Sequence, residues 1–196
     1  WSGLSDVSQF SQVQRGLGAS ALGISSVGGT MNMVTKSTEA QKGGSAYFGI
    51  GNDGFRKYSV SFSTGLMDNG WAITFMGALN TGDGYVKGTN YEGWTYFGNI
   101  SKVINDHHKL SLTAFGAPQW HNQRSTMHYI EDYKNSPDGG RFNNGYGYIN
   151  GEAVGSGYGY NYYHKPQVSL NHYWTIDDKS TLTTSLSVSY THLRAH

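Results

Sequence analysis

Residues 71–80, WAITFMGALN, alternate between large apolar and smaller side chains. Trp71, Ile73 and Phe75 occupy one set of positions, and alanine and threonine begin the other. Successive side chains of a β-strand point to opposite faces of the sheet, so a period of two indicates a strand with one apolar face. Residues 56–64, RKYSVSFST, repeat the pattern with serine on the second face. The two stretches predict neighbouring strands of a sheet.

The same alternation recurs along most of the chain after residue 41. We predict seven strands, at residues 45–51, 56–64, 71–80, 94–100, 110–114, 168–176 and 182–190. Glycine, β-branched and aromatic residues dominate, and no window of eleven residues keeps an apolar face at helical spacing. The predicted fold class is all-β, an up-and-down antiparallel meander.

The connections between these strands predict how the two ends of the sheet differ. Tight turns rich in Asn, Asp and Gly alternate with longer connections: the turns lie at 66–70, 105–107 and 177–179, and the others at 52–55, 82–93 and 118–165. Strict alternation would gather all short turns at one end and all long loops at the other. Transmembrane β-barrels follow this rule, with short periplasmic turns and longer extracellular loops, whereas a soluble sandwich does so only by chance.

The polar face of the predicted strands carries Ser, Thr, Asn, Gly and Ala instead of the Lys and Glu common on soluble sheets. Small uncharged groups suit a filled lumen, and the apolar face suits lipid. Aromatic residues at strand ends, namely Trp71, Trp94, Trp174 and Tyr190, fit girdles at the membrane edges. The pattern favours part of a transmembrane antiparallel β-barrel over a soluble fold.

Composition narrows the function classes. The chain has 196 residues, 28 glycines, 14% aromatic and 14% charged residues, a net charge of +1 and no cysteine. Enough apolar surface exists for folding, no run of about 18 apolar residues predicts a membrane helix, and no basic footprint predicts a nucleic-acid partner. We expect no thiolate or other metal site, no cofactor and no enzyme activity. The G-x-G-x-x-G match at 49–54 is followed by a strand, so we interpret it as a hairpin loop.

Residues 13–36, VQRGLGASALGISSVGGTMNMVTK, have a different character, with repeated glycines and a strand-like end. This stretch resembles the C-terminal part of the plug domain of TonB-dependent outer-membrane receptors. The resemblance is carried by a V-x-R-G turn and a later V-G-G-x-x-N-x-V-T-K motif, with matching residues at Arg15, Gly16, Val27, Gly28, Gly29, Asn32 and Thr35. Residues 114–125, AFGAPQWHNQRS, resemble receptors of this class from Bacteroidetes-like bacteria.

The resemblance implies an active importer of the Gram-negative outer membrane. Residues 1–40 would be the end of the plug, and residues 41–196 the first strands of a barrel of about 22 strands. Such a receptor contacts outer-membrane lipid, takes energy from the TonB complex through its plug, and binds a scarce nutrient such as a siderophore, a cobalamin-like compound or an oligosaccharide. We therefore expect the chain to be a fragment that cannot transport alone, since its sheet edges would be unpaired in lipid.

The predicted extracellular loop, residues 118–165, is the candidate ligand site. It is rich in aromatic residues among Gly and Asn, which suit stacking and hydrogen bonding to a small molecule or oligosaccharide, although such loops also pack on themselves. The candidate ligand-binding residues are Trp120, His121, Arg124, Tyr129, Tyr146 and Tyr160.

Two other function classes remain open at this stage. One is a passive or adhesive outer-membrane barrel, and the other is a secreted β-sandwich that binds glycans. The final string SYTHLRAH resembles translated adapter sequence at a truncated gene end, so we expect residues from about 188 onward to be non-native.

Overall fold

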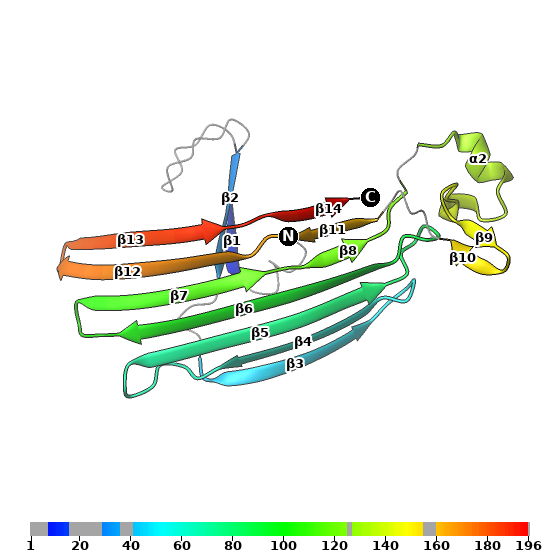
Figure 1. Cartoon of the computed structure of the whole chain (residues 1–196). Coiled ribbons are helices and arrows are strands. Elements are labelled where there is room, and N and C mark those ends of the chain that lie inside the picture. The colour runs from blue at the N-terminus through cyan, green and yellow to red at the C-terminus, as the bar shows by residue number, and fades with distance from the viewer. Residues whose placement is uncertain (1–7, 16–28, 36–40, 125–126, 155–159, 196) are drawn as a thin grey trace.

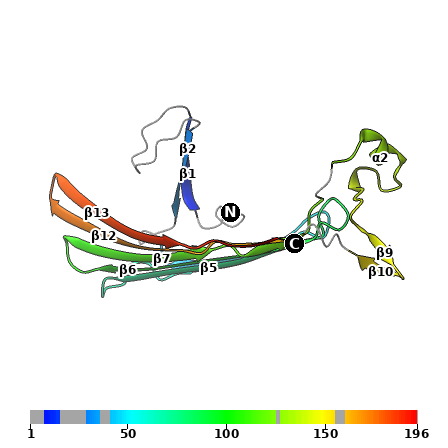
Figure 2. The ribbon, with the colours of Figure 1, turned by 45° about the horizontal axis from the view of Figure 1, so that its top comes forward.

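The computed structural model describes residues 8–15, 29–35, 41–124, 127–154 and 160–195. Its main feature is a curved antiparallel sheet (Figures 1 and 2). Seven strands follow one another in chain order across it: β3 (Gly43–Ile50), β4 (Arg56–Ser63), β5 (Trp71–Gly82), β6 (Tyr91–Val103), β7 (His108–Gly116), β12 (Gln167–Asp177) and β13 (Ser180–Ser189). The seven predicted strands and the all-β meander are confirmed.

Three short strands lengthen the sheet at one end. They are β8 (Gln119–His121), β11 (Asn161–His164) and β14 (His192–Ala195); β8 pairs with β6, and β11 pairs with both β8 and β14. The predicted loop 118–165 therefore begins and ends in sheet. Between these strands lie α2 (Ile130–Asn135), a single 3-10 turn (Gly139–Arg141) and the hairpin of β9 (Gly147–Ile149) and β10 (Glu152–Val154).

The plug-like segment contributes a separate two-stranded sheet of β1 (Ser8–Arg15) and β2 (Gly29–Thr35). Antiparallel register places Arg15 opposite Gly29, and Asn32 and Thr35 also lie in β2. Gly16, Val27 and Gly28 lie outside the described residues. The assignment of these residues to a plug stays a prediction.

The two ends of the sheet differ as expected. The connections 64–70, 104–107 and 178–179 lie at one end, here called the turn end, and 51–55, 83–90 and 117–166 lie at the other, the loop end (Figure 1). The predicted alternation in length fails for the first pair, because 51–55 is shorter than 64–70. Asp53 and Gly54 both have positive φ, of 55° and 69°, and so form the tight turn typical of two-residue hairpin loops.

One face of the sheet buries small side chains and the other exposes large apolar ones, which is the reverse of a soluble sheet. On β5, Ala72, Thr74 and Met76 are buried, whereas Trp71 and Phe75 are exposed. Register extends this division across the sheet: Ile73, Ile100, Leu112, Leu170 and Leu186 are successive partners on the apolar side. We call this side the outer face and the side of Thr74 the inner face. The large side chains lie mostly on the outer face, and the buried core is small, with Met76, Ala78 and Phe97 packed against Phe115.

Hydrogen bonds between short polar side chains hold the inner face together. The Asn99 amide donates to the Ser111 and Thr113 hydroxyl oxygens at 2.8 and 2.7 Å, and the Ser101 hydroxyl donates to Asn99 Oδ1 at 2.8 Å. All four side chains are buried. Buried polar groups need such partners, and these four side chains satisfy one another, whereas the buried Thr95 hydroxyl on the same face has no hydrogen-bond partner.

Candidate functional site

An open cleft of about 600 Å³ lies at the loop end of the sheet. Its described lining comes from β4, β5, β6, β8 and the adjoining loops, and consists of Phe55, Lys57, Asn80, Gly84, Thr89, Tyr91, Glu92, Gly93, Gln119, Trp120, His121 and Asn122. The volume falls within the ~300–1,000 Å³ of sites for small molecules.

Strand register determines which of these side chains face the same way. Lys57, Asn80, Gly93 and Gln119 are successive partners across β4, β5, β6 and β8, and they continue the inner face. Tyr91 and His121 are partners two positions away, so they share that face. The cleft is therefore built mainly on the inner face, at the end of the polar surface described above.

Tyr91 owes its position in the cleft to a glycine. Gly82 is its register partner on β5, and a Cβ atom placed on Gly82 would lie 2.5 Å from the Tyr91 hydroxyl oxygen. The ring therefore lies across the bare backbone of the neighbouring strand. Asn122 is fixed by a second local contact, since its amide donates to Asn90 Oδ1 at 2.8 Å and its backbone N–H to the Asn90 carbonyl at 2.9 Å.

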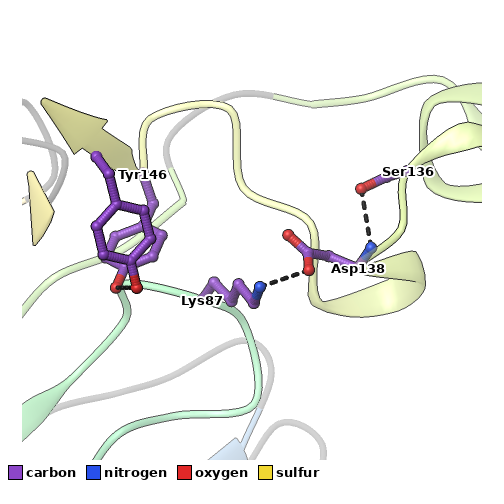
Figure 3. Close-up of polar contacts among 5 residues, drawn as sticks. Lys87, Ser136, Asp138 and Tyr146 are labelled. Atoms are coloured by element: carbon purple, nitrogen blue, oxygen red, sulfur yellow. Dashed lines mark hydrogen bonds and ion pairs between the residues drawn. The ribbon is translucent and has the colours of Figure 1, made fainter. Parts of the chain in front are cut away.

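The loops around the cleft are tied together by charged contacts. Lys87 pairs with Asp138 at 2.5 Å (Figure 3). Arg141 pairs with Asp53 at 2.5 Å, and its guanidinium lies 4.9 Å from the centre of the Tyr85 ring. These contacts join loops 51–55 and 83–90 to the long loop. Both pairs are partly exposed, so each contributes roughly 0–1 kcal/mol.

Hydrogen bonds from backbone and side-chain amides also link these loops. The buried Asn143 donates through its side-chain amide to the Lys87 carbonyl at 2.7 Å, and Lys87 N–H donates to the Arg141 carbonyl at 2.9 Å. Arg124, from the start of the loop, donates to the Phe142 carbonyl at 3.1 Å and lies over the Tyr133 ring.

The structure brings two of the predicted ligand residues, Trp120 and His121, to the cleft. Adjacent strand positions face opposite ways, so the Trp120 side chain projects to the outer face, where its ring stacks on Tyr160 at 6.1 Å. Arg124, Tyr129 and Tyr146 do not line the cleft.

Tyr129 precedes α2 and is 84% exposed. Tyr146 and Tyr148 share a hydrogen bond between their hydroxyl groups, 3.5 Å apart, which raises the pKa of Tyr146 (Figure 3). A ligand role for these loop residues stays a prediction.

Sequence reasoning missed several lining residues, namely Phe55, Lys57, Asn80, Tyr91, Gln119 and Asn122. In the sequence most of them look like ordinary strand or turn residues, and only the pairing of the strands brings them to one cleft. The available signal was the alternation itself: carried to the strand ends, it puts Asn80 on the same face as Thr74.

The outer face has an aromatic row at each end. At the loop end, Trp94 donates through its indole N–H to Glu92 at 2.8 Å, and Tyr96 lies 3.1 Å from His164 Nε2. Tyr96 and Trp94 share a face with Trp120 by register. We call this the upper girdle.

At the turn end, the Lys102 ammonium lies 5.1 Å from the centre of the Trp71 ring. The rings of His108 and Trp174 lie 5.5 Å apart, and His108 Nδ1 lies 3.1 Å from His172 Nε2. We call this row the lower girdle. Polar tips on aromatic or imidazole rings are typical of side chains at a boundary between apolar and aqueous surroundings.

Among the described residues no group of three or more His, Cys, Asp or Glu is arranged to hold a metal ion. Within the same ranges no helix is long and apolar enough to cross a membrane. Comparison with protein-family models and with curated proteins finds no match to this chain.

Proposed function

We propose that this chain forms part of the β-barrel of an outer-membrane importer, with the outer face in lipid, the inner face toward the lumen and the loop end outside the cell. The observation that carries the proposal is the inverted polarity of the sheet. Its apolar side chains form an exposed face across seven strands, while on the central strands β5, β6 and β7 the small polar side chains of the other face are buried, and Asn99, Ser101, Ser111 and Thr113 are hydrogen-bonded to one another.

The spacing of the girdles supports a membrane role. Trp94 and Lys102, in the upper and lower girdles of β6, are eight residues apart, which is about 26 Å along a strand. Strands of outer-membrane barrels tilt by ~35–45°, so this span covers about 20 Å of membrane, close to the ~25 Å apolar band of such barrels. Between them the outer face of β6 carries Tyr96, Gly98 and Ile100, with no charged residue.

The soluble alternative conflicts with the same face. Tyr58, Val60, Phe62, Phe75 and Ile100 are all exposed on adjoining strands. A soluble monomer rarely exposes a continuous apolar patch beyond a few hundred Å², so a secreted sandwich would need a second sheet to cover it. Lipid covers the face without a further element.

The import activity and its energy source rest on the resemblance of residues 13–36 to the end of a plug domain. Under this proposal the protein resides in the Gram-negative outer membrane, β3 and β13 pair with further strands, and the TonB complex acts through the plug. The cleft at the loop end is then the outward-facing part of the ligand path, and the ligand is a small molecule or oligosaccharide.

Cysteine labelling tests the orientation. Residues 1–196 contain no cysteine, so an introduced one is the single thiol of this part of the protein, and any cysteine elsewhere in the full-length protein is replaced by serine for the test. Ile149→Cys lies in the exposed β9–β10 hairpin, and Asp106→Cys lies in the exposed β6–β7 turn. In cells expressing the full-length protein, a membrane-impermeant maleimide should label the first variant on intact cells and the second only after the outer membrane is opened. Labelling of both variants on intact cells, or recovery of the protein in the soluble fraction, would overturn the proposal.

Energy dependence tests the import activity separately. Uptake by cells carrying the full-length protein should stop when the TonB system is deleted, while the labelling pattern stays unchanged. Uptake that persists without TonB would support the passive barrel instead.

A further inference from the structure

We propose that His108 and His172 form a binding site for a divalent transition-metal ion, with Cu²⁺ as the preferred ion. The site lies on the outer face at the turn end of the sheet, the opposite end from the cleft, and it does not depend on the import activity. The two histidines are 64 residues apart in the chain, so no spacing motif marks them in the sequence. The pairing of β7 with β12 brings them together.

The distance between the two imidazoles suits a shared ion. His108 Nδ1 and His172 Nε2 lie 3.1 Å apart, whereas the ring centres lie 5.2 Å apart in planes within 12° of parallel. The rings therefore meet at the edges that carry these nitrogens. Imidazole nitrogens bind Zn²⁺ at ~2.0–2.1 Å, so two such bonds that meet at ~90–110° place their nitrogens about 2.8–3.4 Å apart. The observed distance falls within this range.

The proton balance of the pair allows an ion to replace the hydrogen bond. In that bond one of the two facing nitrogens carries a proton and the other accepts it. A neutral imidazole carries its proton on either nitrogen, so a shift of the proton to the far nitrogen of the same ring frees both facing lone pairs without changing the charge of the protein. The torsion that turns a histidine ring is soft, so both lone pairs can then be aimed at one ion.

The neighbouring side chains hold the pair in position. Trp174 is the register partner of His108, and the two rings lie 5.5 Å apart with their planes 28° from parallel. His172 pairs with Leu110 on β7 and with Thr184 on β13. Both histidines are half-buried, so an ion can reach them while the surrounding side chains keep the two rings close to the geometry that binding requires.

The chemistry of the pair and its neighbours selects the ion. Leu110, Trp174 and Thr184 supply no carboxylate, and Ca²⁺ and Mg²⁺ prefer oxygen ligands. Imidazole suits copper, nickel and zinc, and among these divalent ions Cu²⁺ binds most tightly. Water would complete the coordination. Lys102, on the same face of β6, donates to the Asn69 carbonyl at 2.6 Å, so its ammonium group is turned toward β5 and away from the pair.

The experiment uses the full-length protein in detergent micelles, purified without a histidine tag, with Cu²⁺ alone as the probe. Calorimetric titration should reveal a site that His108→Gln and His172→Gln each weaken roughly 100-fold, because the second imidazole acts at the high effective concentration of a tethered group. The electron paramagnetic resonance spectrum of the bound Cu²⁺ should show nitrogen ligands whose signal is lost in both variants.

His107→Gln is the matched control. His107 directly precedes His108, but its Nδ1 lies 2.8 Å from the Thr175 carbonyl oxygen and it takes no part in the pair, so its removal should leave the affinity for Cu²⁺ unchanged. Equal weakening in all three variants, or unchanged affinity in His108→Gln and His172→Gln, would overturn the inference.

A stability measurement on the unaltered protein decides the question if the glutamine variants do not fold. Cu²⁺ at ~100 times its Kd should shift the folding equilibrium toward the folded state about 100-fold in a urea titration. Absence of any shift would also overturn the inference. The importer proposal would remain standing in that case, because it is tested by cysteine labelling and by uptake.

Discussion

Phe75→Arg is the substitution that most sharply tests the assignment of the two faces. Phe75 is 51% exposed on the outer face, with Phe62 and Gly98 as its partners on β4 and β6. It lies four residues from Trp71 in the lower girdle and four from Leu79 in the row of Trp94, so the proposal places it near the midplane of the membrane. An arginine at that depth costs about 2–4 kcal/mol.

That cost corresponds to a roughly 30- to 700-fold loss in the folding equilibrium of the full-length protein in lipid vesicles. Leu79→Arg is the matched control, because it adds the same charge to the same strand and face at the membrane edge, where the cost falls to ~0–1 kcal/mol. Thr74→Arg places the charge on the inner face, where it loses the 3.2 Å hydrogen bond to Ser63 but, under the proposal, is surrounded by polar side chains instead of lipid.

Urea titration of folding into vesicles, followed by the mobility shift between heated and unheated samples, measures all three variants. We expect Phe75→Arg to be the most destabilised. In a soluble sheet the order of the variants would be reversed. An arginine at the half-exposed Phe75 position would then have little effect on stability, whereas one at Thr74, which is 6% exposed, would be destabilising. Equal stability of Phe75→Arg and Leu79→Arg would refute the placement of the membrane midplane.

Three further predictions concern the interior, a turn and the loops. Asn99→Leu should destabilise the full-length protein by several kcal/mol in the same titration, because Asn99 connects three buried hydroxyl groups, whereas removal of the exposed Ser45 hydroxyl should cost less than ~1 kcal/mol. Gly70→Ala should destabilise by more than ~1 kcal/mol, since Gly70 has φ of 76° and a Cβ there would lie 2.6 Å from a carbonyl oxygen, whereas Gly147→Ala has open space and should be neutral. Arg141→Ala should leave global stability within ~1 kcal/mol yet speed proteolysis of the long loop in cells, and an unchanged cleavage rate would contradict its role in tying the loops.

The strands could be predicted from the sequence because each carries its own alternation. Their ends could not, and β6 shows why. The predicted range, 94–100, covers the apolar part, but the strand continues to Tyr91 on one side and Val103 on the other. The added positions include Glu92 and Lys102, which a hydropathy pattern assigns to loops. In the structure these charges accompany the tryptophans of the girdles.

The cleft was harder to predict because its residues are distant in the chain. Lys57 and Gln119 meet in one row only through two intervening strands, and β8 is three residues long, too short to give a period. The sequence directed attention to the aromatic loop instead. Much of that loop packs on itself, as in the edge-to-face pair of His128 and Phe142, whose ring centres lie 5.1 Å apart.

The same local arrangement, a glycine opposite a tyrosine on the neighbouring strand, occurs on both faces of this sheet. Gly82 opposite Tyr91 and Gly116 opposite Tyr96 are register pairs in which a Cβ on the glycine would collide with the hydroxyl end of the ring. On the outer face the Tyr96 hydroxyl reaches His164 and becomes part of the upper girdle, whereas on the inner face Tyr91 borders the cleft. Glycine is costly in a strand, so its place opposite a tyrosine is explained by what the ring does there. In these two pairs glycine and tyrosine therefore act together, and the face on which a pair lies decides whether its ring joins the upper girdle or borders the cleft.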